Sequence, residues 1–290
     1  MMSSNLLSNL QRQLAERLSA HTETPLLDAQ VLLAHAAGQN RAWVLAHPEA
    51  GLTSKQVAWL QQALSRLEAG MPLPYVLGKW EFFGLSFFVS PAVLIPRPET
   101  ELLVEQALHW AQNRSVQGSR KLRMVDVGTG SGCIAVSLAA NLPNAEITAT
   151  DLSMEALQIA LRNTQAQHVE PRLHLAQCDL LSPFPRRSFD LVCANLPYVP
   201  TASLHNLPIF GKEPTLALDG GADGLVLIRR LFQQARACLA PGGLLLAEIE
   251  VSLGAAVLEL AQAELPSSQS SVLQDYTGRD RLLRVEFTVE

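Results

Sequence analysis

The chain has 290 residues, carries a net charge of −5, and is 48% hydrophobic and 17% charged. This composition is typical of a globular protein and excludes an intrinsically disordered chain. The length suffices for one large domain and a smaller one. The acidic balance counts against a protein that mainly binds nucleic acid, because such proteins must neutralise phosphates.

The four cysteines and seven histidines form no metal-binding pattern. No two cysteines stand at CxxC spacing and the histidines lack an HExxH motif, so we expect no metal and buried thiols in a reducing compartment. Residues 1–10 lack the apolar segment of a signal peptide, and no apolar run is long enough to span a membrane. We therefore expect a cytoplasmic protein without a membrane partner.

Residues 1–72 are expected to form a helical domain. Leucines recur at helical spacing over residues 6–18, and a second helix is expected over Pro25–Ala37. A third is expected over residues 54–70, behind a Thr-Ser pair that can cap it. Because no catalytic constellation occurs here, we expect a substrate-docking domain, with a purely structural appendage as the alternative.

Residues 73–95 are expected to form a hairpin linker. Prolines and then aromatic residues follow the helices, and residues 81–89 fit two short strands around a turn that contains glycine. The next segment, residues 95–100, contains two prolines that hold a loop extended ahead of another helix.

From Leu122 onward strands and helices alternate. The candidate strands are Arg123–Val127, Glu146–Thr150, Leu173–Gln177, Leu191–Ala194, Leu244–Ile249 and Leu282–Val289. Helical patterns lie near Ile134–Ala140, Met154–Gln165 and Leu225–Leu239. This order predicts an α/β domain over residues 96–290 with a doubly wound, mostly parallel sheet.

The segment from Met124 to Gly132 combines a strand, a glycine-rich turn and the start of a helix. Glycines let the backbone approach a ligand there, and the helix N-terminus offers free N–H groups. Gly132 follows Gly130 too closely for the dinucleotide fingerprint, which counts against an NAD-dependent oxidoreductase. With Asp126 the pattern D-x-G-x-G-x-G resembles the S-adenosylmethionine loop of class I methyltransferases. The candidate cofactor-binding residues of this loop are Asp126, Gly128, Thr129, Gly130, Ser131 and Gly132.

Two acidic residues each follow a strand. Asp151 closes the second strand, where its carboxylate can accept both hydroxyls of a ribose or, alternatively, cap the next helix. Asp179, followed by Leu180, comes after the third strand, where class I methyltransferases contact the adenine. A plain loop acid is the alternative for Asp179. Together with the glycine loop, this spacing predicts S-adenosyl-L-methionine as the cofactor.

The fourth strand ends in Asn195, Leu196, Pro197 and Tyr198, at the sheet edge where ligands bind. The motif resembles the N-P-P-Y motif of methyltransferases that act on planar amine or amide nitrogens. The Asn195 side-chain oxygen and the Leu196 carbonyl can each accept one hydrogen of an NH2 group, while Tyr198 packs on its plane. Catalysis by positioning can supply about 7–11 kcal/mol. A simple turn after the strand is the structural alternative.

Further motifs extend this resemblance over nearly the whole chain. They are Pro74–Gly78, Glu81–Gly84, Leu94–Glu101, Glu213–Pro214, Ala217–Leu218, Gly220–Gly221, Asp223–Gly224 and Asp275–Arg281. With them the chain is similar to the bacterial HemK-type glutamine-N5 methyltransferases, which modify the Gly-Gly-Gln glutamine of peptide chain release factors. The resemblance implies a seven-stranded, Rossmann-like sheet, S-adenosyl-L-methionine as cofactor and release factors as protein partners. It also implies that Asn195 contacts the cofactor as well as the substrate. We expect a monomer that forms no stable complex with nucleic acid.

Two positions depart from that family's pattern. The family usually has proline where this chain has Leu196, and glycine where it has Glu250. Because Asn-Leu-Pro-Tyr also resembles the motif of rRNA adenine dimethylases, an adenine methyltransferase acting on RNA or DNA is the alternative function. An inactive methyltransferase fold that binds the translation apparatus is a third possibility.

Two charged residues near the motif have alternative roles. Arg97 is expected either to pair with Glu99 or Glu101 or to face the acidic end of the cofactor. Glu213 is expected either to order the loop after Tyr198 or to lie in solvent.

Overall fold

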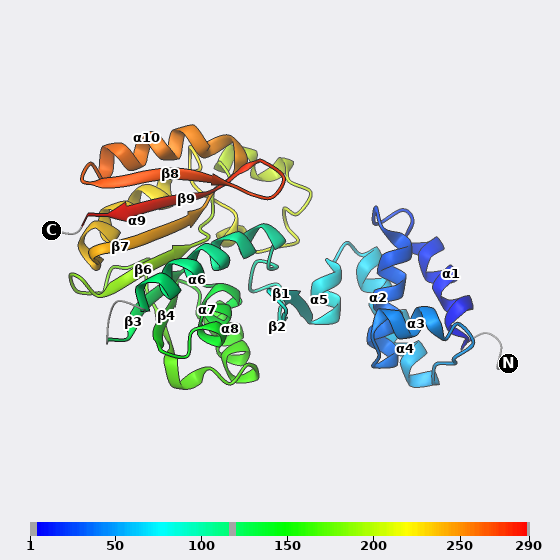
Figure 1. Cartoon of the computed structure of the whole chain (residues 1–290). Coiled ribbons are helices and arrows are strands. Elements are labelled where there is room, and N and C mark those ends of the chain that lie inside the picture. Colours follow the sequence, from blue (N-terminus) through cyan, green and yellow to red (C-terminus); the bar gives the residue numbers. More distant parts are fainter. Residues whose placement is uncertain (1–4, 116–119, 289–290) are drawn as a thin grey trace. The chain divides into compact units, whose positions relative to one another are not determined.

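The computed structural model describes residues 5–115 and 120–288 (Figure 1). The chain divides into two compact units, Met1–Lys79 and Trp80–Glu290. Each unit has its own apolar core. The functional domain limits expected at residues 72 and 95 stay predictions.

The first unit is a bundle of short helices. Its elements are α1 (Leu7–Leu18), α2 (Pro25–Ala37), α3 (Arg41–Ala46), α4 (Ser54–Glu68) and α5 (Leu73–Leu77). The three expected helices form where the leucine spacing places them, and Thr53 caps α4 in a capping box with Gln56. Helix α3 was not expected. Helix α5 lies in the segment expected as a linker, and its Val76 is buried in the core of the bundle.

A hairpin of β1 (Lys79–Phe82) and β2 (Leu85–Phe88) lies at the start of the second unit, which takes all of it except Lys79. The turn residues Phe83 and Gly84 both have positive φ, at 50° and 70°, which suits the twist of a tight hairpin. The expectation of two short strands around a glycine is therefore confirmed.

A seven-stranded sheet with the order β5-β4-β3-β6-β7-β9-β8 forms the centre of the second unit (Figure 1). Its strands are β3 (Leu122–Val127), β4 (Ala145–Asp151), β5 (Leu173–Gln177), β6 (Phe189–Ala194), β7 (Leu239–Glu248), β8 (Ser268–Gln274) and β9 (Asp280–Phe287). Strands β3 to β7 pair in parallel, whereas β9 pairs antiparallel with β7 and β8. The predicted doubly wound α/β sheet is confirmed, and the order reverses between β3 and β6, where ligands bind in such folds.

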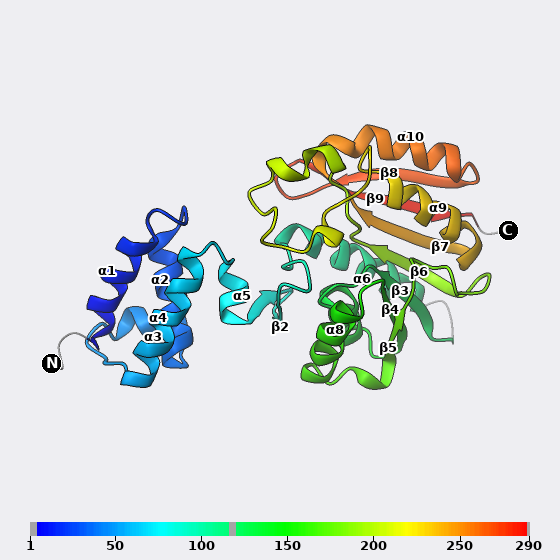
Figure 2. The same ribbon diagram turned by 180° about the vertical axis from the view of Figure 1, so that it is seen from behind.

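Helices cover both faces of this sheet (Figure 2). They are α6 (Glu101–Ser115), α7 (Cys133–Asn141), α8 (Met154–Ala166), α9 (Val226–Cys238) and α10 (Gly254–Glu264), with short 3-10 turns at Pro98–Thr100, Glu170–Arg172, Thr201–Asn206, Thr215–Ala217 and Val251–Leu253. Neighbouring strand residues such as Met124 and Val125 point to opposite faces, so α6 and α7 pack on one face and α9 and α10 on the other. Burial on both faces explains why β6 and β7 are almost continuously apolar.

The four cysteines are free thiols, and Cys133, Cys193 and Cys238 are buried. In the part of the chain that the structure describes, no helix has both the length and the apolar composition needed to cross a bilayer.

Candidate active site

A cavity of about 340 Å³ lies at the carboxyl ends of the parallel strands, beside the point where the strand order reverses. The predicted site residues that line it are Gly128, Thr129, Gly130, Ser131, Asp151, Asp179, Leu180, Asn195, Leu196 and Pro197. Asp126, Gly132 and Tyr198 do not line it. The sheet therefore brings together residues from four separate segments of the sequence.

The glycine loop between β3 and α7 needs its glycines for two reasons. Gly128, Gly130 and Gly132 have φ of 71°, 54° and 81°, a region that side chains disfavour. A Cβ on Gly128 would lie 2.9 Å from Leu196 Cδ2, and one on Gly132 would lie 3.2 Å from Ala160 Cβ. The loop therefore lies close under Leu196 and beside α8.

Asp126 lies beneath this loop and is fully buried. Its Oδ2 accepts hydrogen bonds from the Thr129 hydroxyl at 2.6 Å and from the Ala135 N–H at 3.2 Å. Burial raises the pKa of Asp126 to about 7, although these two hydrogen bonds act in the opposite direction. Asp126 thus holds the loop to the first turn of α7 from the side away from the cavity.

Asp151 faces the cavity with both carboxylate oxygens fixed. Oδ2 accepts from the Gly130 N–H at 2.8 Å, and Oδ1 accepts from the Ser153 N–H at 2.9 Å. The side-chain cap of α8 is Ser153, which accepts from the Ala156 N–H, so the alternative role of Asp151 as helix cap is not the one observed. Burial raises the pKa of Asp151 above its ordinary value. Each oxygen keeps lone pairs for further donors, as the recognition of a diol requires.

Asp179 and Leu180, which follow β5, also line the cavity. Asp179 Oδ2 accepts from the Arg230 guanidinium at 2.5 Å, an ion pair that joins the loop after β5 to α9. Leu180 has a φ of 54°, which is uncommon for a residue with a branched side chain. Such backbone conformations occur often at ligand-binding sites.

The Asn195 amide is oriented by two neighbours at the end of β6. Its Nδ2 donates to Thr100 Oγ1 at 3.0 Å, and it also donates to the carboxyl group of Glu248, at the end of β7. Thr100 in turn donates to Glu248. With Nδ2 engaged on this side, the amide oxygen of Asn195 is available to accept a hydrogen bond in the cavity.

Glu248 is 2% exposed and was not singled out as a site residue from the sequence. Burial raises its pKa to about 7, opposed by the hydrogen bonds from Thr100 and Asn195 and by the charge of Arg281. Its Oε2 has no hydrogen-bond partner among the described residues. We name Asn195–Tyr198 the substrate motif, after the role that its sequence predicts. A buried acid beside this motif is therefore poised to change protonation near neutral pH.

The segment from Leu196 to Tyr198 is held by a second loop rich in glycine. A Cβ on Gly220 would lie 2.7 Å from Tyr198 Cα and 2.8 Å from the Pro197 carbonyl oxygen. The backbones of Val199 and Gly220 hydrogen-bond at 2.8 Å. Burial raises the pKa of Tyr198 to about 12, so its phenol stays neutral. The glycine at 220 thus permits the close backbone contact that fixes the substrate motif.

Arg97 pairs with a residue far away in the sequence, so the expected partners Glu99 and Glu101 were wrong. Its guanidinium donates to Glu213 Oε1 at 2.5 Å, while Glu213 Oε2 accepts from the Ile95 N–H at 3.1 Å. Glu213 is 5% exposed, which rules out the solvent-exposed alternative and agrees with an ordering role. Glu101 instead accepts from the Phe83 N–H. The Arg97–Glu213 pair ties the proline-containing loop to the loop after the substrate motif.

Asn163 is a second residue that the sequence did not indicate. It is buried on α8, accepts from the Phe88 N–H at 2.7 Å and donates to the Ser131 carbonyl at 2.8 Å. It thereby connects the β1–β2 hairpin to the glycine loop. No motif marks an asparagine inside a helix for this role, because its partners come from distant segments.

Comparison with known proteins agrees with this geometry. Residues 9–78 match the model of the PrmC N-terminal domain, and residues 100–206 match the methyltransferase small domain. A protein from Moorella thermoacetica named release factor glutamine methyltransferase is 44% identical over 89% of this chain and 90% of its own length. A protein of the same name from Koribacter versatilis is 42% identical over 83% of this chain and 85% of its own. Among solved structures, a methyltransferase from Pyrococcus furiosus superposes with a TM-score of 0.51 at 16% identity, covering 82% of this chain and 100% of that one, which shows the fold alone.

Proposed function

The chain belongs to the release factor glutamine methyltransferases, and from that premise we propose which atoms carry the reaction. The proposed reaction transfers a methyl group to the side-chain amide nitrogen of the glutamine in the Gly-Gly-Gln motif of a peptide chain release factor. The single observation that best supports it is the oriented Asn195 amide, whose nitrogen donates to Thr100 and whose oxygen is left for a substrate.

The cavity suits S-adenosyl-L-methionine as the methyl donor. A Cβ on Gly128 would narrow the space at Leu196, and Asp151 offers acceptor atoms at the place where a ribose diol would bind. Asp179 and Leu180 would contact the adenine. When bound, this cofactor supplies an electrophilic methyl group on sulfur.

The glutamine amide would lie between Asn195 and Leu196. One amide hydrogen is donated to Asn195 Oδ1 and the other to the Leu196 carbonyl, which presents the nitrogen to the methyl group. Leucine can replace proline at 196 in this scheme because the acceptor belongs to the backbone. The Leu196 side chain is buried against the glycine loop, which makes up for the rigidity that a proline ring would give. Tyr198 would pack on the plane of the amide.

The proton of the amide needs no strong general base in this scheme. An amide nitrogen becomes acidic once it carries the new methyl group, so the proton can leave after transfer. The residues then act by holding the nitrogen in line with the departing sulfur, which is catalysis by proximity and orientation.

Methyl transfer from labelled cofactor to purified release factor tests this function, with RNA and DNA as parallel substrates. Label on the Gly-Gly-Gln glutamine is expected, with a loss of about 100-fold in kcat/KM for Asn195→Ala. The matched control is Asn206→Ala, at an exposed position in the turn Thr201–Asn206. Label on nucleic acid alone would instead establish the adenine methyltransferase.

The helical unit would dock the folded part of the release factor. Leu26 and Leu45 are 52% and 50% exposed on α2 and α3, where apolar side chains favour a protein contact. The double variant Leu26→Ser/Leu45→Ser should raise KM for intact factor about 5- to 10-fold and leave KM for a short Gly-Gly-Gln peptide unchanged. Leu161→Ser, on α8, is the control for loss of an exposed leucine. Equal effects on factor and peptide would contradict docking by this unit.

The oligomeric state and the cellular location of the enzyme are further proposals. We expect a monomer in the cytoplasm, where release factors act. Mass determination in solution tests the oligomeric state, and cell fractionation tests the location.

A further inference from the structure

A second cavity lies at the opposite edge of the sheet from the candidate active site. It has a volume of about 250 Å³ and is lined by the guanidinium-bearing residues Arg186, Arg187 and Arg236. Its other lining residues include Pro241, Pro266 and Phe287, and no described carboxylate lines it. We name this cavity the basic groove. In a chain with a net charge of −5, three arginines around one cavity form a local concentration of positive charge.

The arginines of the basic groove make no ion pair with a described carboxylate. All three are exposed to solvent. Some other arginines of this protein pair with carboxylates, as Arg97 does with Glu213 and Arg230 with Asp179. The guanidinium groups of the groove therefore keep their full charge and their donors available for an anion.

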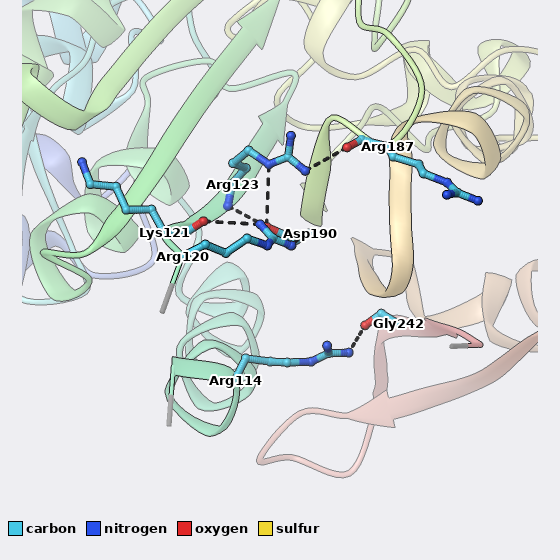
Figure 3. Close-up of polar contacts among 7 residues, drawn as sticks. All are labelled: Arg114, Arg120, Lys121, Arg123, Arg187, Asp190 and Gly242. Atoms are coloured by element: carbon cyan, nitrogen blue, oxygen red, sulfur yellow. Dashed lines mark hydrogen bonds and ion pairs between the residues drawn. The ribbon is translucent and has the colours of Figure 1, made fainter. Parts of the chain in front are cut away.

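Further cations continue from the groove along the same edge, as Figure 3 shows. Arg123 donates to the Arg187 carbonyl at 2.8 Å, which joins the start of β3 to the loop that forms one wall of the groove. Arg120 and the backbone of Arg123 bind Asp190, and Arg114 donates to the Gly242 carbonyl. A carbonyl partner leaves the charge of Arg114 uncompensated. We name Arg114, Arg120, Lys121 and Arg123 the basic edge.

The cations of the groove and the edge outnumber the carboxylates that they contact. Asp190 binds both Arg120 and Arg123, and Glu146 binds Lys121. The described part of the edge therefore carries a net positive charge that extends beyond one cavity. One small phosphate would need only the groove, whereas a row of cations suits a chain of phosphates.

The net charge led us to expect no stable complex with nucleic acid, but the local charge differs from it. We propose that the basic groove and the basic edge bind the phosphodiester backbone of an RNA strand. Arginine recognises phosphate through two parallel N–H donors, and the half-buried Phe287 offers an aromatic surface on which a base can stack. A membrane surface fits less well, because the large exposed apolar side chains of the described residues lie elsewhere in the chain.

RNA is preferred over DNA because release factors act on the ribosome, a particle rich in RNA, and this choice alone rests on the proposed function. The groove lies at the amino ends of the parallel strands β6 and β7 and shares no lining residue with the candidate active site. RNA bound there would leave the cofactor cavity open. The enzyme could thus be held near particles that contain RNA while it modifies a protein.

Fluorescence anisotropy with a labelled 12-nucleotide single-stranded RNA of mixed sequence tests the site, with the full chain and no cofactor. The wild type should bind saturably at 50 mM salt. The triple variant Arg186→Gln/Arg187→Gln/Arg236→Gln should bind about 10-fold more weakly or worse, and the slope of log affinity against log salt should fall by about 2. The control Arg12→Gln/Arg41→Gln/Lys55→Gln removes the same charge from exposed positions of the helical unit and should bind like the wild type.

The outcomes separate the proposal from its competitors. No saturable binding by the wild type, equal weakening in the control, or binding of poly-glutamate as tight as that of RNA would overturn it. Tighter binding of DNA of the same sequence would overturn the assignment to RNA. If the triple variant melts early, Arg186→Gln and Arg236→Gln are measured singly, each with an expected loss of about 2- to 3-fold. Since no methyl transfer is measured, failure of the proposed function leaves these results unaffected.

Discussion

The two edges of the central sheet are built with opposite chemistry. At the carboxyl edge, Asp126 and Asp151 accept hydrogen bonds from backbone N–H groups of the glycine loop, the first turn of α7 and the N-cap residue of α8. At the amino edge, Arg114 and Arg123 donate to backbone carbonyls of Gly242 and Arg187 (Figure 3). At the carboxyl edge, carboxylate side chains accept hydrogen bonds from backbone N–H groups. At the amino edge, arginine side chains donate hydrogen bonds to backbone carbonyls.

Chain direction explains this difference. In a parallel sheet the helices run back against the strands, so the N-termini of α7 and α8 meet at one edge and the C-termini of α6 and α9 at the other. Helix N-termini favour negative groups and C-termini favour positive ones, by about 0.3–1 kcal/mol each. Arg114 and Arg236 both lie in last turns of helices. The same topology that forms the candidate active site at one edge thus permits a cationic surface at the other.

Outside the substrate motif, the largest effect on methyl transfer is expected from Gly220→Ala at the carboxyl edge. The new Cβ would lie 2.7 Å from Tyr198 Cα, a backbone atom that cannot move without shifting the substrate motif. A displacement of this size should lower kcat/KM about 100-fold. Gly51→Ala, where nothing lies within 4 Å, should leave kcat/KM unchanged. Full activity in Gly220→Ala would show that the close contact is not needed.

Asp151→Asn should weaken cofactor binding by about 10-fold or more. An amide places an NH2 group against one of the two N–H donors, from Gly130 or Ser153, and loses a charged acceptor worth about 1.5–3 kcal/mol. Isothermal titration with S-adenosyl-L-methionine measures the change in Kd. Asp28→Asn removes the same charge from α2 and serves as control. An unchanged Kd in Asp151→Asn would place the ribose elsewhere.

Glu248→Gln should reduce the activity several-fold above pH 7 and remove an inflection from the pH profile. The pKa of Glu248 is raised to about 7, and its ionised form, which only accepts, fixes the Thr100 hydroxyl and the Asn195 amide. Activity of the wild type should therefore rise with pH through about 7. Asp126 titrates in the same range, so the variant decides which acid is responsible.

Ionisation of Glu248, which should raise the activity, should lower the stability of the fold. A pKa raised from the ordinary 4.5 to about 7 means that the folded state binds the proton more tightly, so this contribution to folding is full below pH 4.5 and is lost as pH rises through 7. Unfolding by urea measures how much the free energy of unfolding falls between pH 5 and pH 8. This fall should be smaller for Glu248→Gln than for the wild type. An equal loss in both would assign the effect to another group.

Asp190→Asn should lower the free energy of unfolding and leave the rate of methyl transfer unchanged. Burial favours the neutral acid, but the hydrogen bonds from Arg120 and Arg123 outweigh it and lower the pKa of Asp190. This stabilisation is therefore present above the ordinary pKa and is lost as pH falls through the lowered value. Its loss should cost about 1–3 kcal/mol in the free energy of unfolding at pH 7. Reduced kcat with intact folding would show that the two edges are coupled.

The sequence determined the local features of this protein because their causes are local. Glycine spacing and strand ends placed Gly128, Asp151 and Asn195 at one cavity, since the carboxyl ends of parallel strands share an edge. Leucine spacing and caps placed α1, α2 and α4. Strand β8, with the polar pattern Ser-Gln-Ser-Ser, was missed, because an edge strand buries little and lacks an apolar signal.

Only the tertiary structure decided contacts between distant segments. The partner of Arg97 is Glu213, and the amide of Asn195 is oriented by Thr100 and Glu248. Sequence spacing cannot indicate such pairs, because side chains a hundred residues apart meet only after the sheet has set the strand order. The basic groove arises in the same way, from a loop, a helix end and the last strand. Periodicity encodes which residues are buried, whereas packing decides which buried and charged residues meet.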